Sequence, residues 1–133
     1  SYNANLANGL GNLVSRVLKM AISYEVEFPK NIGEDLLVDE YKELLSKYCI
    51  QEASDLIWKE IRWCDQEIQK WEPFKLIKTD PEKAKEILKG LLANLQKIAY
   101  MLVPILPAAS QKITAVLKNP TLENIPQLFP RLE

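Results

Sequence analysis

Two asparagines and an arginine near the start of the chain have side-chain types and a spacing suited to recognising a polar ligand. Asn8, Asn12 and Arg16 follow one another at intervals of four residues, so on an α-helix they line one face. Their amides and guanidinium offer hydrogen-bond donors and acceptors in a row. Asparagine is a poor helix former that an ordinary solvated face avoids. The row therefore indicates either a recognition surface or amides that cap or bond to a neighbouring helix.

The element that would position this row is an amphipathic helix over residues 1–20. Apolar side chains recur there at steps of three and four residues, which is the pattern of a helix with one buried face. Gly9 and Gly11 each cost roughly 1 kcal/mol against alanine inside a helix, so they indicate close packing against a neighbour. The apolar positions are Leu6, Leu10, Leu13, Val14, Val17, Leu18 and Met20.

A second group of candidate residues surrounds a forced helix break. Pro73 cannot continue a helix without the loss of a hydrogen bond, so a helix is predicted to end near Trp71, and Phe74 follows the break. Aromatic rings beside cations suit an unstacked nucleotide, because a ring stacks on the base and a cation attracts the phosphate. Alternatively, the two rings clamp the end of the helix onto the core. The nearby cations are Lys70, Lys75 and Lys78.

Catalytic and metal-binding patterns are missing from the sequence. It holds no histidine, which removes the commonest general base and the commonest metal ligand. Cys49 and Cys64 stand alone, without a CxxC pair, so we expect two small buried hydrophobic side chains in a reducing compartment. No glycine-rich phosphate loop occurs either. The sequence therefore predicts no catalytic residue and no metal site.

The composition is that of one soluble globular domain. The chain has 133 residues, of which 47% are hydrophobic and 26% charged. Its 17 basic and 18 acidic residues give a net charge of −1, so any contact with RNA must be local. The most apolar run, 98–106, contains Pro104 and is too short to span a bilayer, and no signal peptide pattern is present. We expect a cytoplasmic protein.

Helical periodicity recurs along the rest of the chain, and no stretch alternates with a period of two. The helix predicted at residues 50–71 carries an apolar stripe over six turns, so we expect it to be the spine of a bundle. Trp58 and Trp63 lie off this stripe and are expected to face a second neighbour. The fold class is all-α, an antiparallel bundle of about five helices. The helices are predicted at residues 1–20, 34–48, 50–71, 81–103 and 108–117, with 1–118 as the domain and 119–133 as an extended tail.

A strong helix start precedes residue 81. Asp80 can cap the helix with Pro81 at its first position, or Thr79 can form a capping box with Glu82.

The first helix resembles that of the anticodon-binding domain of methionyl-tRNA synthetases, a class I synthetase family, whose pattern runs roughly N-A-x-L-x-N-x-x-G-N-L-x-x-R. The resemblance continues through residues 56–61, 72–74, 102–107 and 128–133. It covers nearly the whole chain, and the first helix is its most specific part. The matching residues there are Asn3, Ala4, Leu6, Asn8, Gly11, Asn12, Leu13 and Arg16.

The resemblance implies recognition of the CAU anticodon of methionine tRNAs, with the cytosine unstacked and read by polar side chains. Carried over by position, Asn12 and Arg16 would contact the cytosine edge, and Asn8 lies one turn earlier on the same face. Phe74 stands where the family usually has a stacking tryptophan, so it becomes the expected stacking platform. Trp71 is a second candidate for that role.

The resemblance also implies what this chain does not do alone. The family's catalytic signatures, His-Ile-Gly-His and Lys-Met-Ser-Lys-Ser, do not occur, so we expect no activity and no cofactor in this chain. ATP and magnesium would serve the catalytic domain of the same polypeptide. That domain and methionine tRNA are the expected partners, and neither DNA nor a membrane is expected.

Two alternatives remain open at this point. One is the equivalent domain of another class I synthetase, such as that for cysteine or leucine, which the row of Asn8, Asn12 and Arg16 disfavours. The other is a helical protein-interaction scaffold without an RNA role, which the near-neutral charge favours. An independent enzyme is disfavoured by the missing catalytic patterns.

Overall fold

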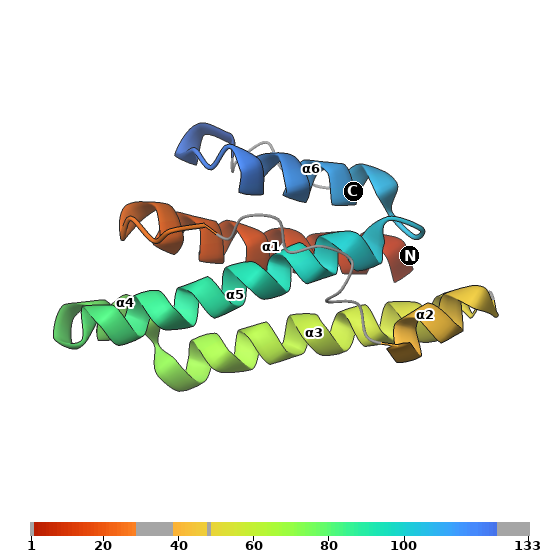
Figure 1. Cartoon of the computed structure of the whole chain (residues 1–133), viewed down its shortest axis with the longest axis horizontal. Coiled ribbons are helices and arrows are strands. Elements are labelled where there is room, and N and C mark those ends of the chain that lie inside the picture. The colour runs from red at the N-terminus through yellow and green to blue at the C-terminus, as the bar shows by residue number, and fades with distance from the viewer. Residues whose placement is uncertain (1, 29–38, 48, 125–133) are drawn as a thin grey trace.

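The computed structural model describes residues 2–28, 39–47 and 49–124, and within these ranges it describes no side chain for residues 2–7, 40, 50 and 124. In this part of the chain every regular element is a helix, which confirms the all-α prediction. The elements are α1 (Tyr2–Ser23), α2 (Asp39–Ser46), α3 (Ile50–Trp71), α4 (Pro73–Thr79), α5 (Pro81–Leu102), α6 (Pro107–Lys118) and the short 3₁₀ helix η2 (Leu122–Asn124) (Figure 1).

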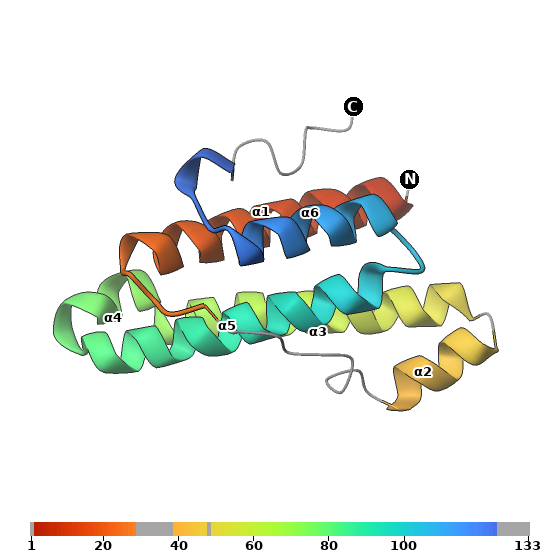
Figure 2. The ribbon, with the colours of Figure 1, turned by 45° about the horizontal axis from the view of Figure 1, so that its top comes forward.

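The helices form a bundle in which α5 has more helical neighbours than any other described helix. Helices α1 and α6 lie on one side of the bundle, and α3 and α5 lie on the other (Figure 2). Helix α5 contacts α1, α3, α4 and α6, whereas α2 packs against α3 and η2 packs against α1. The sequence analysis assigned the central position to α3. The finding differs because α5 buries more of its residues than α3 does and packs against four other helices.

Neighbouring helices of the bundle do not all run antiparallel. Gly9 of α1 lies against Trp58 of α3, and Arg16 lies against Asp65, so equal steps along the two helices stay paired. Helices α1 and α3 therefore run in the same direction, as their colours show in Figure 1. The chain between Ser23 and Ile50 is long enough to return to the starting end before α3 begins.

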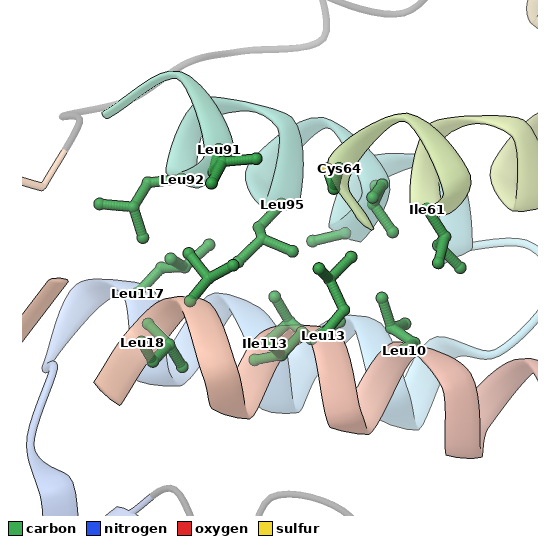
Figure 3. Packing of buried hydrophobic residues seen from close by; sticks show 14 of the residues in the cluster. Leu10, Leu13, Leu18, Ile61, Cys64, Leu91, Leu92, Leu95, Ile113 and Leu117 are labelled. Carbon is green, nitrogen blue, oxygen red and sulfur yellow. The ribbon is translucent and has the colours of Figure 1, made fainter. Parts of the chain in front are cut away.

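The core is a single cluster of apolar side chains from α1, α3, α5 and α6. Figure 3 shows them meeting between the helices, with Leu13 of α1, Cys64 of α3 and Leu95 of α5 close to the centre. The apolar face predicted for α1 is buried wherever its side chains are described, apart from the half-buried Met20. The fully buried α1 residues are Leu10, Leu13, Val14, Val17, Leu18 and Ala21.

The predicted helix break after Trp71 is present and leads directly into another helix. Glu72 adopts the left-handed conformation, with φ 45° and ψ 62°, and Pro73 opens α4. The sequence analysis did not anticipate α4, because its short length leaves little periodicity to read. At the next helix start, Asp80 Oδ1 accepts from the Lys83 N–H at 3.3 Å. The Thr79 hydroxyl instead donates to the Leu76 carbonyl at 3.4 Å, so Asp80 is the cap of α5.

Buried polar contacts connect α5 to its neighbours. Glu60 of α3 accepts from Asn94 Nδ2 at 2.9 Å and from Lys97 Nζ at 2.8 Å, which satisfies both carboxylate oxygens. The Tyr41 hydroxyl of α2 donates to the Met101 carbonyl of α5. These contacts fix α2 and α3 against the same helix.

Two predicted boundaries fall partly outside the described residues. The helix expected at 34–48 is seen as α2 from Asp39 to Ser46, and residues 34–38 and 48 lie outside the described ranges. Within the stretch read as an extended tail, Leu122–Asn124 forms η2. Residues 125–133 lie outside the description. None of the helices in the described part combines the length and apolarity that crossing a bilayer needs.

Replacing two helical glycines, Gly9 and Gly90, tests the close approach of α1 to α3. A Cβ at Gly9 would lie 3.0 Å from Trp58 Cη2 and 3.2 Å from Cζ3, whereas a Cβ at Gly90 would meet no atom within 4 Å. We expect Gly90→Ala to raise the free energy of unfolding by about 1 kcal/mol. We expect Gly9→Ala to lower it by about 1 kcal/mol, since crowding outweighs the gain in helix propensity. Urea denaturation measures both free energies. Equal stabilisation by the two variants would show that the Trp58 ring moves aside without an energetic cost.

Removing the Tyr41 hydroxyl tests the contact between α2 and α5. Tyr41 is fully buried, and burial raises its pKa to about 12, so the hydroxyl is a donor at neutral pH. We expect Tyr41→Phe to lower the free energy of unfolding by about 1–2 kcal/mol, because the Met101 carbonyl loses its buried donor. Urea denaturation at pH 7 is the measurement. An unchanged midpoint would mean that this hydrogen bond contributes nothing to stability.

Candidate nucleic-acid interface

The Asn8, Asn12 and Arg16 row lies on the exposed face of α1. All three side chains are exposed, and the buried apolar residues Leu10, Leu13 and Val14 lie between them in the sequence. Neither asparagine is hydrogen-bonded to another residue in the described part of the chain. The alternative in which the amides bond to a neighbouring helix therefore has no contact to support it. Lys19 extends the row by one further step toward the end of α1 and is also exposed.

Gly9 has the packing role that the sequence predicted for it. Its backbone faces the ring of Trp58, with a closest approach of 3.0 Å for an added Cβ. Because the missing side chain lets α1 come close to α3, the row on α1 is set beside the surface of α3. Trp58 is partly buried against the core, which agrees with the prediction that it faces a second neighbour.

An acidic side chain of α3 completes the end of the row. Arg16 Nη1 lies 3.8 Å from Asp65 Oδ1, and the two side chains are 53% and 43% exposed. Burial raises the pKa of the Asp65 carboxyl above its ordinary value, and the nearby Arg16 guanidinium lowers it. The sequence analysis missed Asp65, because its place beside Arg16 depends on the parallel packing of α1 and α3.

Phe74 is the exposed aromatic ring of the helix break. It is the second residue of α4 and is 44% exposed. The Lys75 ammonium lies 6.0 Å from the ring centre, at the outer limit of a cation–π contact. Helix α4 lies at the end of the bundle toward which α1 and α3 run (Figures 1 and 2). Phe74 therefore sits beyond the Arg16 end of the row, on a different helix.

Trp71 is half-buried and lies on a different face of α3 from Asp65. The Lys70 and Lys83 ammonium groups lie 5.1 Å and 5.0 Å from its ring centre. The ring lines a shallow cavity of about 200 Å³ between α3 and α5, together with Trp63, which is 43% exposed. The cavity is lined by residues of α3 and α5, whereas Asp65 faces α1. The structure thus separates Trp71 from the row.

The cysteines fit a structural role. Both are free thiols, and Cys64 is buried while Cys49 is only half-buried. Burial raises the pKa of Cys64 to about 12, with Glu60, Asp65 and Glu67 adding to the rise and the Asn94 hydrogen bond opposing it. A thiol with this pKa stays protonated and unreactive at neutral pH. In the described part of the chain, no group of three or more acidic, histidine or cysteine side chains could hold a metal ion.

Comparison with known proteins gives a consistent set of relatives. The methionine–tRNA ligase of Methanopyrus kandleri is 30% identical over 119 residues, covering 84% of this chain and 18% of the relative. That of Chloroherpeton thalassium is 33% identical over 122 residues, covering 84% and 17%. That of Clostridium acetobutylicum is 34% identical over 125 residues, covering 84% and 19%. The chain is related to a segment of the methionine–tRNA ligases.

The similarity has a clear limit in length. The chain spans less than a fifth of the length of these three methionine–tRNA ligases. No protein-family model and no solved structure gives a significant match. The relationship confirms the predicted resemblance to methionyl-tRNA synthetases and supports a synthetase domain. The roles of Asn8, Asn12, Arg16, Phe74 and Trp71 in anticodon binding stay predictions.

The raised pKa of Asp65 predicts how this residue affects stability. Because the folded-state pKa lies above the ordinary value of 3.8, folding favours the protonated carboxyl. Its contribution to stability is complete below pH 3.8 and is lost as the pH rises through the folded-state pKa. We expect Asp65→Asn to match the parent chain at pH 3 and to exceed it in free energy of unfolding at pH 7. Urea denaturation at the two pH values measures this, and a variant less stable only at pH 7 would show that the attraction of Arg16 outweighs burial.

Proposed function

We propose that this chain is the anticodon-binding domain of a methionine–tRNA ligase and that it recognises the CAU anticodon. The observation that carries the proposal is the exposed row of Asn8, Asn12 and Arg16 on α1, which the fold does not use for packing. Its support from outside the chain is the similarity to methionine–tRNA ligases over 84% of the chain. Asparagines that weaken a helix and whose side chains bond to no described neighbour are best explained by a ligand.

The proposed mechanism is recognition of an unstacked cytosine, the first base of the anticodon. Asn12 and Arg16 contact its edge and the neighbouring backbone, and Asn8 lies one turn earlier on the same face. An amide and a guanidinium complement the amine donor and the two acceptors of cytosine. By analogy with base-edge contacts in duplexes, each good pairing discriminates by about 1–3 kcal/mol.

Phe74 is the proposed stacking platform. Its ring is 44% exposed on α4, the helix that follows α3, and base stacking on an aromatic ring contributes about 1–3 kcal/mol. Trp71 is the weaker candidate, because Lys83 already lies over its ring and α5 covers part of it. A ring engaged in packing has less free face for a base.

The chemistry of aminoacylation is proposed to lie elsewhere in the polypeptide. The chain corresponds to less than a fifth of its relatives' length, so the catalytic domain, with its ATP and magnesium, belongs to the remainder. We propose that this chain has no ligase activity and holds no cofactor by itself. Its own contribution is selection of methionine tRNA.

The near-neutral charge of the chain limits how much phosphate contacts can contribute to the proposed RNA binding. The net charge is −1, so the chain as a whole does not attract RNA. Few lysines adjoin the row, and a small number of phosphate contacts means a weak dependence of affinity on salt. Recognition by this domain would rest on base contacts more than on phosphate contacts.

The test is a titration of the 133-residue chain with two anticodon stem-loops, one with CAU and one with the first base changed to U. We expect Arg16→Ala to weaken binding of the CAU loop by about 10-fold or more, because it loses a bidentate base contact. The melting temperature should change little, since Arg16 is 53% exposed. The matched control is Arg62→Ala, which removes the same charge from an exposed position of α3.

Two results would contradict the proposal. Equal affinity of the parent chain for both loops would leave only general RNA binding. A large fall in melting temperature for Arg16→Ala would make Arg16 structural and remove the assigned site. Either result would favour the alternative of a protein-interaction scaffold. The cavity beside the exposed Trp63 is the best candidate surface for that role.

A further inference from the structure

A hydrogen-bond acceptor lies beside Arg16 that neither the sequence pattern nor the similarity to other proteins assigns. Asp65 Oδ1 of α3 is 3.8 Å from Arg16 Nη1 of α1, and both side chains are about half exposed. The separation is longer than a good charge-assisted hydrogen bond, so the two groups share a surface without saturating one another. Donors of the guanidinium and lone pairs of the carboxylate both remain available to a ligand.

A contribution to folding stability alone does not explain the pair of Arg16 and Asp65. An exposed ion pair contributes little to folding stability. Burial raises the pKa of Asp65, which means that the surroundings disfavour its charge. Glu67 lies two residues along α3 and lines the α3–α5 cavity, so it supplies no positive charge that would compensate the burial of Asp65. A carboxylate kept in such surroundings fits a site that uses it.

The edge of cytosine matches this donor–acceptor pair. Its O2 and N3 are adjacent acceptors, which a planar guanidinium can contact with two N–H groups. With Arg16 on these two acceptors and the Asn12 amide on the neighbouring backbone, the 4-amino group remains on that edge, and it is a donor that needs an acceptor. A carboxylate is the side-chain group that typically accepts from the cytosine 4-amine.

We propose that Asp65 is a specificity-determining residue, whose carboxylate accepts a hydrogen bond from the 4-amino group of the cytosine that Arg16 binds. This inference rests on the proposed function. It assigns the two halves of cytosine recognition to different helices, with the donor on α1 and the acceptor on α3. The parallel packing of these helices brings the two groups together.

The same arrangement rejects uracil. Uracil carries a carbonyl oxygen in place of the 4-amine, so its lone pairs would face the lone pairs of the carboxylate. Its N3 is a donor, so Arg16 also loses one acceptor. Discrimination of C from U therefore has a repulsive part that Asp65 supplies and an attractive part that both residues supply.

The experiment measures binding of the 133-residue chain to three stem-loops that differ at the first anticodon base. The bases are cytosine, uracil and pyrimidin-2-one, which is cytosine without its 4-amino group. For the parent chain we expect loss of the amine to weaken binding about 10-fold, within the usual range for one base-edge contact. For Asp65→Ala the same loss should change binding by less than about 3-fold, because the acceptor is gone.

Asp65→Asn supplies a second, shape-conserving variant. An amide can accept from the cytosine amine or donate to the uracil carbonyl, so the preference for C over U should fall by about 10-fold. Glu67→Gln is the matched control, since it removes the same charge two residues away on the cavity face of α3. That control should keep both the preference for C and the effect of the missing amine.

The outcomes separate this inference from the proposed function. If the parent chain does not prefer C over U, the proposed function fails and the inference fails with it. If the parent chain prefers C but Asp65→Ala is as sensitive to the missing amine as the parent, only the inference is overturned. If Asp65 only positions Arg16, the Asp65 variants would bind all three stem-loops more weakly and by the same factor. That result would also overturn the proposed direct contact.

Discussion

Burial of the apolar face of α1 against α3 and α5 is the constraint on which the rest of the structure depends. Six α1 side chains from Leu10 to Ala21 are almost fully inaccessible, which at about 25 cal/mol per Å² is the main favourable term available to this helix. Burying that face fixes the rotation of α1. Once the rotation is set, the opposite face must carry Asn8, Asn12 and Arg16 outward.

The candidate interface shows how a nearly neutral protein can present a specific polar surface. Under the proposed function, selectivity there would depend on the order of donors and acceptors and little on the sum of charges. A guanidinium from α1 and a carboxylate from α3 offer opposite polarity within a few ångströms. An all-basic surface of the same size would bind any single-stranded RNA, because every nucleotide carries the same phosphate.

Sequence periodicity predicted the long helices and their buried faces because each depends on residues three and four positions apart. The stripes of α1, α3 and α5 and the cap at Asp80 are local properties of this kind. The central position of α5, the parallel course of α1 and α3 and the contact of Asp65 with Arg16 depend on tertiary packing, which periodicity does not encode. The half-burial of Cys49 escaped for the same reason, whereas the helix α4 escaped because its short length leaves little periodicity.

The weak intrinsic helicity of α1 has a consequence for the dynamics of the domain. Two asparagines and two glycines between residues 8 and 12 leave this segment little tendency to stay helical when it is detached from the core. Partial opening of the bundle would therefore abolish the ordered row together with the helix. A ligand that holds the row binds only the docked form, so it would suppress such opening and slow amide hydrogen exchange along α1. Recognition and the integrity of this one segment are then thermodynamically linked.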